Sequence, residues 1–406
     1  MRLPVSIRIP LESLNFFMAD LQAGVGPFLG VYLQAQGWQS GAIGDVMTIG
    51  GVAGMAITTP AGAVVDASRH KRLLLIASGL CSMLASAAIL LSHRFWVVAA
   101  SQVATAIAGA AIGPAVVGIT LGLVGQAGFN RQNGRNQAFN HAGNMVGAGA
   151  SGYLGWQYGL PAIFILAGGF GLLAIVSTTF IPPRAIDHRR ARGQIEDGSG
   201  DASGVRGYRV LVECKPLLVL AAALGLFHLG NGAMLPLYGL AVVAAKQGNP
   251  ASVAALTIVV AQGVMIVTSL IAMRLADTKG YWLVMLVSFA ALPIRASIAA
   301  FFIKEWGVFP VQILDGVGAG LQSVAVPGLV AHLLDRTGRV NVGQGAVMAV
   351  QGVGAAISPA LGGWMAEWAG YRTAFLILGV FPLISLALWF YFSSEFAPRE
   401  NNASAR

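Results

Sequence analysis

The chain has 406 residues, of which 56% are hydrophobic and only 10% are charged, and its mean hydropathy is +0.71. Soluble domains carry about 25% charged residues, so this composition excludes a water-soluble fold and indicates that most outward-facing side chains contact lipid. The net charge of +9 lies in short segments between apolar stretches and forms no continuous basic face, which argues against nucleic acid as a partner.

Apolar segments long enough to cross about 30 Å of hydrocarbon, at about 20 residues each, follow one another along the chain. Twelve can be delimited, at residues 11–34, 41–65, 71–92, 95–125, 136–158, 160–182, 215–245, 251–275, 281–303, 308–334, 342–368 and 372–394. The sequence therefore predicts an all-α integral membrane protein with twelve transmembrane helices. Because the first segment follows Arg2 and Arg8 with no short apolar core or small-residue cleavage site, we expect it to stay as an anchor.

Basic residues fall mostly on one side of these predicted helices. If the amino terminus lies inside, twenty of the 25 Lys and Arg residues are cytoplasmic, four lie on the opposite face, and Arg295 lies within a span. This distribution follows the positive-inside rule, and a missed or extra helix would scramble it. It predicts a multi-pass protein of the bacterial inner (plasma) membrane with both termini in the cytoplasm.

One connector differs from the others. Residues 183–214 begin PPRAIDHRRARGQIEDGSGDASG, a polar and charged stretch with Gly and Ser that is typical of a flexible tether. It divides the chain into an N-terminal six-helix bundle at residues 1–182, a cytoplasmic linker at 183–214, and a C-terminal six-helix bundle with a short cytoplasmic tail at 215–406.

The two halves share landmarks at a constant offset of 211 residues. The offset superposes Asp66 on Asp277, Gly109 on Gly320, Gly143 on Gly354, Gly152 on Gly363, Gly159 on Gly370 and Phe164 on Phe375. A common offset in several helices is hard to obtain by chance. It predicts two bundles related by a pseudo-two-fold axis along the membrane normal, with a solute site possible at their interface.

Several motifs resemble those of the major facilitator superfamily. The loop after the second helix is similar to the cytoplasmic signature of that family, and the matching loop of the second half carries a weaker copy with Asp277. The residues of the first loop are Gly62, Asp66, Arg69, Lys71 and Arg72. Helices five and eleven carry patterns similar to the GxxxGPxxGG motif of the family's antiporters, namely Gly143, Gly147 and Gly152, and Gly354, Pro359 and Gly363.

The chain also departs from the family patterns. Ala67 and Arg69 replace a residue that is usually basic and one that is usually Gly, and Ala148 replaces the Pro of the antiporter motif. Thr105 stands where proton-coupled drug exporters are expected to have Arg. The resemblance implies a secondary transporter that works by alternating access, and these departures weigh against drug efflux in particular.

The signature and the glycine motifs each allow two interpretations. Asp66 could bond across the bundle interface in one state only and act as a gate, together with Gly62, Arg69 and Asp277. The alternative is that these charges fix topology and cap helix ends, which we favour for Lys71 and Arg72. Small residues at four-residue spacing let helices pack closely, and a rocking interface is the functional alternative.

Asp20 is the strongest candidate for solute or proton binding. It lies about nine residues into the first predicted helix, roughly 14 Å from the inner boundary, where an ionisable side chain is costly unless it is paired, protonated or hydrated. The 211-residue offset places Asn231 opposite it, with His228 one turn away. We expect Asp20 to titrate or to bind a cationic group with these two residues as partners. The alternative is a structural hydrogen bond, with His228 as a satisfied interior histidine.

Arg295 and Asp315 form a second ionisable couple. They lie at similar depth in the ninth and tenth predicted helices, and an intramembrane Arg needs a partner. We therefore predict an intramembrane ion pair with a structural role, and substrate-anion binding by Arg295 is the alternative.

Amide side chains collect on one face of the fifth predicted helix. Gln137, Asn140 and Asn144 share that face with His141, and either a wet cavity wall or an interhelical hydrogen-bond seam would explain the stripe. Gln322 in the tenth helix and Gln351 in the eleventh are weaker candidates of the same kind.

Motifs for other chemistry are absent from the sequence. It contains no GxxxxGK[ST] phosphate loop, no His/Cys/Glu cluster with metal-ligand spacing and no GxSxG turn, so we expect no enzyme activity, no cofactor and no bound metal. The expected partners are a small-molecule substrate, protons and the lipid bilayer, and we expect a monomer. Proton-coupled efflux is the favoured function. Uptake or facilitated diffusion is the alternative, and a non-transporting membrane sensor is a distant third.

Overall fold

The computed structural model describes residues 3–23, 26–188, 214–334 and 340–396, and helices are the only regular secondary structure in those ranges. The first half contains α1 (Val5–Ala23), α2 (Gly26–Ala35), α3 (Ser40–Ala67), α4 (Lys71–Leu91), α5 (Phe95–Tyr158), α6 (Pro161–Thr179) and the 3-10 turn η1 (Pro183–Ala185). The second half contains α8 (Lys215–Asn231), α9 (Met234–Ala244), α10 (Pro250–Lys279), α11 (Tyr281–Phe301), η3 (Glu305–Gly307), α12 (Val308–Leu333), α13 (Val340–Tyr391) and α14 (Ser393–Phe396).

The helices follow the predicted spans closely and confirm the all-α membrane fold. Nine helical stretches within the described residues are long and apolar enough to cross a membrane. The last of these, Gly343–Tyr391, is broken at Gly370 and provides two spans. The remaining spans of the predicted twelve are α1 with α2, and the part of α5 that follows a break at Gly125.

Two glycines show that the repeat extends to the backbone. Gly159, at the end of α5, has φ 86° and ψ 163°, and Gly370, inside α13, has φ 80° and ψ 158°. Positive φ values of this kind favour Gly because it has no Cβ. The two residues are 211 positions apart, so both halves use the same sharp turn between their last two helices.

Local signals explain other helix ends. The side chain of Asn249 accepts hydrogen bonds from the backbone nitrogens of Ala251 (3.0 Å) and Ser252 (3.2 Å), and Pro250 occupies the first position of α10. An Asn cap followed by Pro is a favoured helix start. The same helix ends at Gly280, whose φ of 80° again suits Gly.

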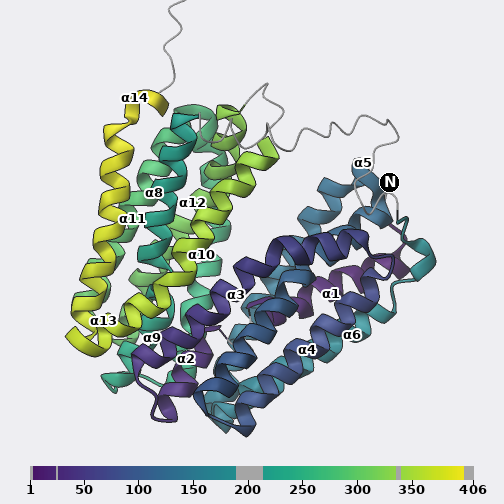
Figure 1. Ribbon diagram of the computed structural model, residues 1–406, viewed down its shortest axis with the longest axis horizontal. Helices are drawn as coiled ribbons and strands as arrows, with labels where there is room; N and C mark the ends of the chain where they lie inside the picture. The colour runs from purple at the N-terminus through teal and green to yellow at the C-terminus, as the bar shows by residue number, and fades with distance from the viewer. Residues whose placement is uncertain (1–2, 24–25, 189–213, 335–339, 397–406) are drawn as a thin grey trace, which may run out of the picture.

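The helices of the two halves form two bundles that are inclined to each other (Figure 1). The bundles meet at the end where α2 and α9 lie, and they separate towards the end that carries the N-terminus and α14. The two ends of the described chain therefore lie on the same side of the molecule.

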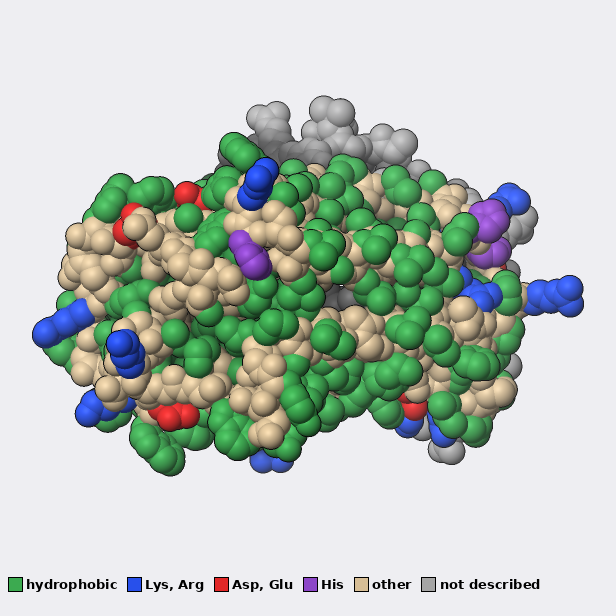
Figure 2. All heavy atoms as spheres, turned by 90° about the horizontal axis from the view of Figure 1, so that it is seen from below, with side chains coloured by type: hydrophobic (Ala, Val, Ile, Leu, Met, Phe, Trp, Pro, Cys, Tyr) green, Lys and Arg blue, Asp and Glu red, His purple; other side chains and the backbone are tan. Residues whose placement is uncertain are grey.

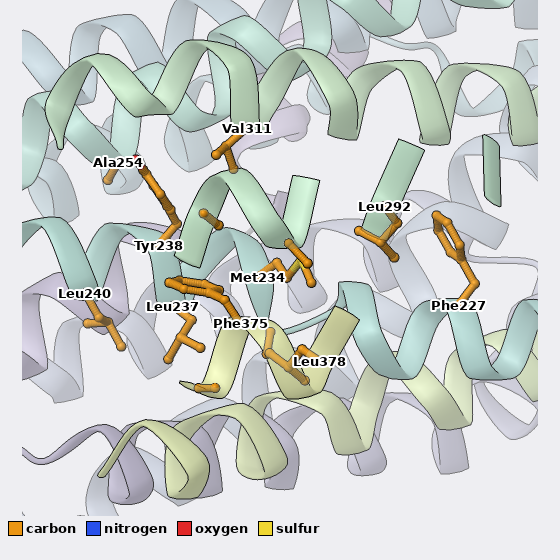
Figure 3. Close-up of a cluster of buried hydrophobic side chains, with 14 of the residues drawn as sticks. Phe227, Met234, Leu237, Tyr238, Leu240, Ala254, Leu292, Val311, Phe375 and Leu378 are labelled. Atoms are coloured by element: carbon orange, nitrogen blue, oxygen red, sulfur yellow. The ribbon is translucent and has the colours of Figure 1, made fainter. Parts of the chain in front are cut away.

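The larger apolar core lies mostly in the second half and continues into the first half, where Tyr32 and Ile43 belong to it. Side chains from α8, α9, α11 and α13 pack together there, among them Phe227, Met234, Tyr238, Phe375 and Leu378 (Figure 3). A smaller core in the first half includes Leu11, Leu14 and Ile112. Many large apolar side chains also face outwards along the helices, such as Leu84 on α4 and Leu270 on α10. Apolar side chains along the helices are what a bilayer requires. Figure 2 shows the molecule from the end at which the bundles meet, where hydrophobic, polar and charged side chains are mixed.

Candidate functional site

A buried ion pair links α11 to α12. Arg295 is 0% exposed, and its Nη1 atom lies 2.8 Å from Oδ1 of Asp315, whose side chain is 13% exposed. Asn231, the last residue of α8, donates from Nδ2 to the same carboxylate oxygen at 3.3 Å and accepts a hydrogen bond from Arg295 Nη1. Arg295 Nη2 donates to Oε1 of Gln312 at 3.4 Å. The structure thus brings Arg295, Asp315 and Asn231 together and adds Gln312.

This cluster ties three helices of the second half to one another. A charged pair inside a membrane bundle is stable only when its remaining hydrogen-bonding groups find partners, and Asn231 and Gln312 supply most of them. Nε of Arg295 and Nε2 of Gln312 are buried without a hydrogen-bond partner among the described residues. Because the Arg295 guanidinium is fully enclosed, this geometry favours the structural role over anion binding.

A cavity of about 270 Å³ lies between α8, α12 and α13. Two of these helices, α8 and α12, also carry residues of the ion-pair cluster. Its polar lining comes from His228, Gln322, Ser323, Gln344 and Gln351. Apolar side chains, including Val326 and Met348, line the rest. Within the described residues no Lys, Arg, Asp or Glu lines this cavity, so it offers hydrogen bonds without charge.

The hydrogen bonds of the lining define what it can accept. Nδ1 of His228 lies 2.9 Å from the carbonyl oxygen of Leu224, and because a carbonyl only accepts, Nδ1 carries the hydrogen. In the neutral form of the ring, Nε2 is then an acceptor. Gln322 uses its amide nitrogen to donate to Ser288 Oγ at 2.9 Å, which leaves its carbonyl oxygen as an acceptor. The cavity therefore presents acceptors to a donor-bearing solute.

In the first half, the amide stripe of α5 makes hydrogen bonds both to α1 and within α5 itself. Asn140 Nδ2 donates to the carbonyl oxygen of Asn15 in α1 at 3.4 Å, and Asn144 Nδ2 donates to Asn140 Oδ1 at 3.4 Å. Asn136 Nδ2 donates to Thr120 Oγ1 at 2.9 Å. Gln137 is exposed. Asn140 thus joins α5 to α1, whereas Asn144 and Asn136 bond within α5 and Gln137 lies outside these contacts.

One member of the stripe reaches the other bundle. His141 Nδ1 lies 3.1 Å from Oε1 of Gln262 in α10, and since an amide oxygen only accepts, His141 is the donor. This hydrogen bond crosses between the two halves of the chain. The sequence placed His141 in the polar stripe, whereas Gln262 was not singled out.

Two pairs of helices close the end at which the bundles meet. In the α5–α10 seam, Gly152 and Gly155 pack on Ala255 and Ala251, and in the α3–α13 seam, Gly363 packs on Ser40 and Gly44. An added Cβ at Gly152 or Gly363 would overlap its neighbour. These contacts interchange under the offset of 211 residues, because Gly152 corresponds to Gly363, Ala251 to Ser40 and Ala255 to Gly44.

The α3–α13 seam also carries hydrogen bonds between the halves. Trp364 Nε1 donates to Asp45 Oδ1 at 2.9 Å, and the backbone nitrogen of Gly41 donates to Glu367 Oε2 at 3.0 Å. Tyr371 OH lies 2.7 Å from Ser40 Oγ and accepts from Gln34 Nε2 at 3.1 Å. Further along, the backbone nitrogen of Ala360 donates to Thr48 Oγ1 at 2.9 Å. The seam is therefore polar as well as closely packed.

The remaining motif glycines pack helices within each half. Gly143 abuts the backbone of Phe16 in α1, and Gly354 abuts the backbone of Gly225 in α8. Gly147 is buried, and the carbonyl of Pro359 lies against Gly44. The glycine motifs thus serve both packing within a bundle and contact between bundles.

The signature loop lies at the end where the bundles separate. Lys71 is 1% exposed, and its Nζ donates to the carbonyls of Val65 and Ser68 at the end of α3. Arg72 donates to the carbonyls of Thr178 (3.1 Å) and Thr179 (2.8 Å) at the end of α6. These contacts cap helix ends. Arg69 is exposed, and an added Cβ at Gly62 would meet nothing within 4 Å.

Three predicted site residues have side chains outside the described part of the structure. They are Asp20, Asp66 and Asp277, so the grouping of Asp20 with His228 and Asn231 and the gating role of the two other carboxylates stay predictions. In the described residues no group of three or more His, Cys, Asp or Glu side chains could hold a metal ion.

Several residues of these contacts escaped the sequence analysis. Gln312 lies three residues before Asp315 on the same helix face, and that spacing could have identified it. Asp45 is a lone carboxylate in an apolar helix, which could have marked it by the same argument as Asp20. Gln262, Gln344 and Trp364 lack any spacing signal, because their roles depend on how two bundles are rotated against each other.

A duplicated helical membrane protein with seams between its halves and an uncharged polar cavity has the architecture of a solute transporter. The profile described as Major Facilitator Superfamily matches residues 13–342 and 284–406. This chain belongs to that family and is a multi-pass membrane protein. Two uncharacterized MFS-type transporters of Mycobacterium tuberculosis, from strains CDC 1551 / Oshkosh and ATCC 25618 / H37Rv, are each 36% identical over 377 residues, which is 93% of this chain and 90% of the relative.

Solved structures of low sequence identity share the fold. A mutant form of the nucleoside transporter NupG superposes with a TM-score of 0.79 at 14% identity, covering 96% of this chain and 100% of that one. A bacterial homologue of the human lysosomal transporter Spinster, in an inward-facing and unoccupied conformation, gives a TM-score of 0.73 at 13% identity over 97% of this chain and 96% of that one. The predicted family and fold are confirmed.

Proposed function

We propose that this protein is a secondary active transporter that exports a small organic solute across the bacterial plasma membrane in exchange for protons, by alternating access. The observation that carries the proposal is that the two seams are related by the repeat: Gly152 and Gly363, 211 residues apart, make equivalent contacts with the opposite half. A duplicated protein that closes one end with such contacts can close the other end by rocking the same two bodies.

The orientation of the described state follows from the basic residues. The end at which the bundles separate carries the N-terminus, the loop with Arg69 and Lys71, and α14 (Figure 1). Basic loops favour the cytoplasmic side. We therefore assign this conformation as open to the cytoplasm and closed to the outside by the α3–α13 and α5–α10 seams.

The uncharged cavity of the second half suggests the kind of solute. Its lining offers the imidazole of His228 and the amides of Gln322, Gln344 and Gln351, with Met348 as an apolar surface. Such a lining suits a compact solute without net charge that carries both hydrogen-bond donors and an apolar face. A permanently charged solute would lose hydration there without gaining a counter-charge.

Proton exchange rests on Asp20 and on the antiporter-like glycine motifs. A carboxyl group at midplane favours its neutral form when it is desolvated, which suits a group that binds and releases protons. Uptake or facilitated diffusion is the second candidate, since Ala148 replaces the motif Pro and Thr105 replaces the expected Arg. Thr105 Oγ1 is buried without a hydrogen-bond partner among the described residues.

Reconstitution into sealed liposomes tests the proposal. Uncharged candidate solutes are loaded under an imposed pH gradient, and solute flux and internal pH are recorded together. We expect solute movement coupled to proton movement, lost in Asp20→Asn at unchanged folded yield, and retained in Glu305→Gln, which changes a carboxylate in the turn before α12. No movement of any solute would overturn transport. Coupled movement that persists in Asp20→Asn would overturn only the proton-carrier role.

The gating role of Asp66 has a separate test. Cysteines introduced at the two ends of the molecule report which end is open to a water-soluble reagent. We expect Asp66→Asn to change the relative labelling of the two ends, because the variant would weaken a contact made in one state only. Unchanged labelling would leave Asp66 as a topology residue.

A further inference from the structure

A second cavity, of about 650 Å³, lies at the end of the first half where α4 begins and α6 is followed by η1. Arg69, His70, Lys71, Arg72 and His188 line it. Within the described residues no Asp or Glu lines the cavity. Five cationic or protonatable side chains around one space, with no carboxylate in the described lining, form a region of positive potential that attracts an anion.

Part of this basic lining is already engaged and part is available. Lys71 and Arg72 donate to backbone carbonyls at the ends of α3 and α6, so they hold the walls in place. Arg69 and His70 are exposed. Nδ1 of His188 is buried and has no hydrogen-bond partner among the described residues. Arg69 and His188 are therefore the groups best able to bind a ligand.

The apolar part of the cavity continues along the exposed, lipid-facing side of α4. Leu73 and Ile76 line the cavity beside the basic residues. Leu73 is 62% exposed, and Leu80 and Leu84, on the same helix, are 46% and 71% exposed. Residues 73, 76, 80 and 84 share one helix face by their spacing. An anion that binds here thus has a strip of hydrocarbon-facing side chains directly beside it.

We propose that this cavity binds the phosphate headgroup of an acidic phospholipid, with an acyl chain along the apolar strip of α4. Arg69 and His188 would contact the phosphate, while Lys71 and Arg72 would add charge from the wall. Basic pockets between membrane helices near the cytoplasmic surface favour such headgroups. A soluble phosphate compound would use the basic groups but leave Leu73, Leu80 and Leu84 without a partner. The site is independent of the solute, the direction of transport and the coupling ion.

Lipid retention by the full purified chain tests this proposal. Native mass spectrometry in detergent is used to measure binding of phosphatidylglycerol and of phosphatidylcholine at matched concentrations. We expect one phosphatidylglycerol to bind in preference to phosphatidylcholine. Each basic residue near a membrane surface contributes about a fivefold effect on binding, so Arg69→Gln should weaken phosphatidylglycerol binding about fivefold and the double variant with His188→Asn should weaken it further.

Arg184→Gln is the matched control, because Arg184 is an exposed residue of η1 that does not line the cavity. Arg72 is not varied, since its loss would uncap α6. Equal retention of both lipids, or equal loss in Arg69→Gln and Arg184→Gln, would overturn the proposal. Displacement of the lipid by inorganic phosphate at the same concentration would show a phosphate site rather than a lipid site and would also overturn it.

Discussion

The α3–α13 and α5–α10 seams occupy equivalent places in the repeat, yet they are held together differently. Both place a glycine of one half against small residues of the other, Gly363 on Ser40 and Gly44, and Gly152 on Ala251 and Ala255. Among the described residues, the α3–α13 seam adds a set of hydrogen bonds, such as Trp364 to Asp45. The α5–α10 seam has His141 to Gln262.

The difference separates the packing of the interface, which the two halves share, from its hydrogen bonds, which they do not. Close approach of two helix backbones needs only small residues, and both halves have small residues at the equivalent positions. Hydrogen bonds need particular partners, and each copy could lose or gain them separately. We infer that packing lets either seam close, whereas polar contacts decide how strongly each one stays closed.

The comparison of the seams assumes that each bundle moves as one body. The substitution Arg295→Met tests this for the second half, because it removes the ion pair that joins α11 to α12. The substitution leaves Asp315 without its cation, and loss of one partner of a buried ion pair costs about 3–5 kcal/mol. We expect the largest effect of the series, a loss of folded protein measured by size-exclusion profile and thermal unfolding. Arg295→Met combined with Asp315→Leu removes both charges and should recover much of the yield. Full yield in Arg295→Met alone would contradict the structural role.

Glycine substitutions test the shared packing. In Gly363→Val or Gly152→Val the new side chain overlaps the opposite half, and overpacking of this kind costs about 1–3 kcal/mol. We expect each variant to shift the two-state balance towards opening of the closed end by about fivefold or more, measured as spin-label distances across that end. Gly345→Val and Gly149→Val are the controls on α13 and α5, because an added Cβ there meets nothing within 4 Å. Equal shifts in a variant and its control would refute the packing argument.

Trp364→Phe sharpens the polar side of the comparison. The variant leaves the Asp45 carboxylate without its indole donor, and a hydrogen bond to a charged group is worth about 1.5–3 kcal/mol when both partners are desolvated. Because Asp45 lies at a seam that opens to water, we expect the lower end, about a tenfold shift towards the open seam in cysteine labelling at the α3–α13 contact. Asp45→Asn retains an oxygen acceptor and should shift the balance less. A larger shift in Asp45→Asn than in Trp364→Phe would contradict this account.

His141 and Gln262 should give the smallest effect. Their neutral hydrogen bond is worth about 0.5–1.5 kcal/mol. A double-mutant cycle with His141→Phe and Gln262→Leu, read by labelling at the α5–α10 contact, should show a coupling of about 1 kcal/mol or less. A coupling larger than the effect of Trp364→Phe would reverse the ranking of the two seams.

Much of the fold could be predicted from hydropathy because each span is a long apolar run with charged ends. The predicted span 71–92 corresponds to Lys71–Leu91, and 281–303 corresponds to Tyr281–Phe301. The interruption between α8 and α9 at residues 232–233 was not predicted, because the apolar run continues across it. The second part of α5 begins after Gly125, earlier than the predicted residue 136, because a polar helix can extend past the membrane.

Part of the candidate site could be predicted from the depth of each residue in the membrane. Arg295 and Asp315 lie on consecutive helices at matching depth, so their proximity could be anticipated from residue counts. Asn231 was expected to face Asp20, but its described hydrogen bonds are to Asp315 and Arg295. Which face of an apolar helix turns inwards has no periodic signal, so Gln262 and Trp364 required the three-dimensional arrangement.

The interchange of Ser40 and Gly44 with Ala251 and Ala255 restricts how this chain can change length. A residue inserted or deleted between the start of α3 and Gly44 would turn the rest of that helix by about 100°. The small side chains would then leave the contact with α13. Insertions and deletions among homologues should therefore avoid the first turns of α3 and α10.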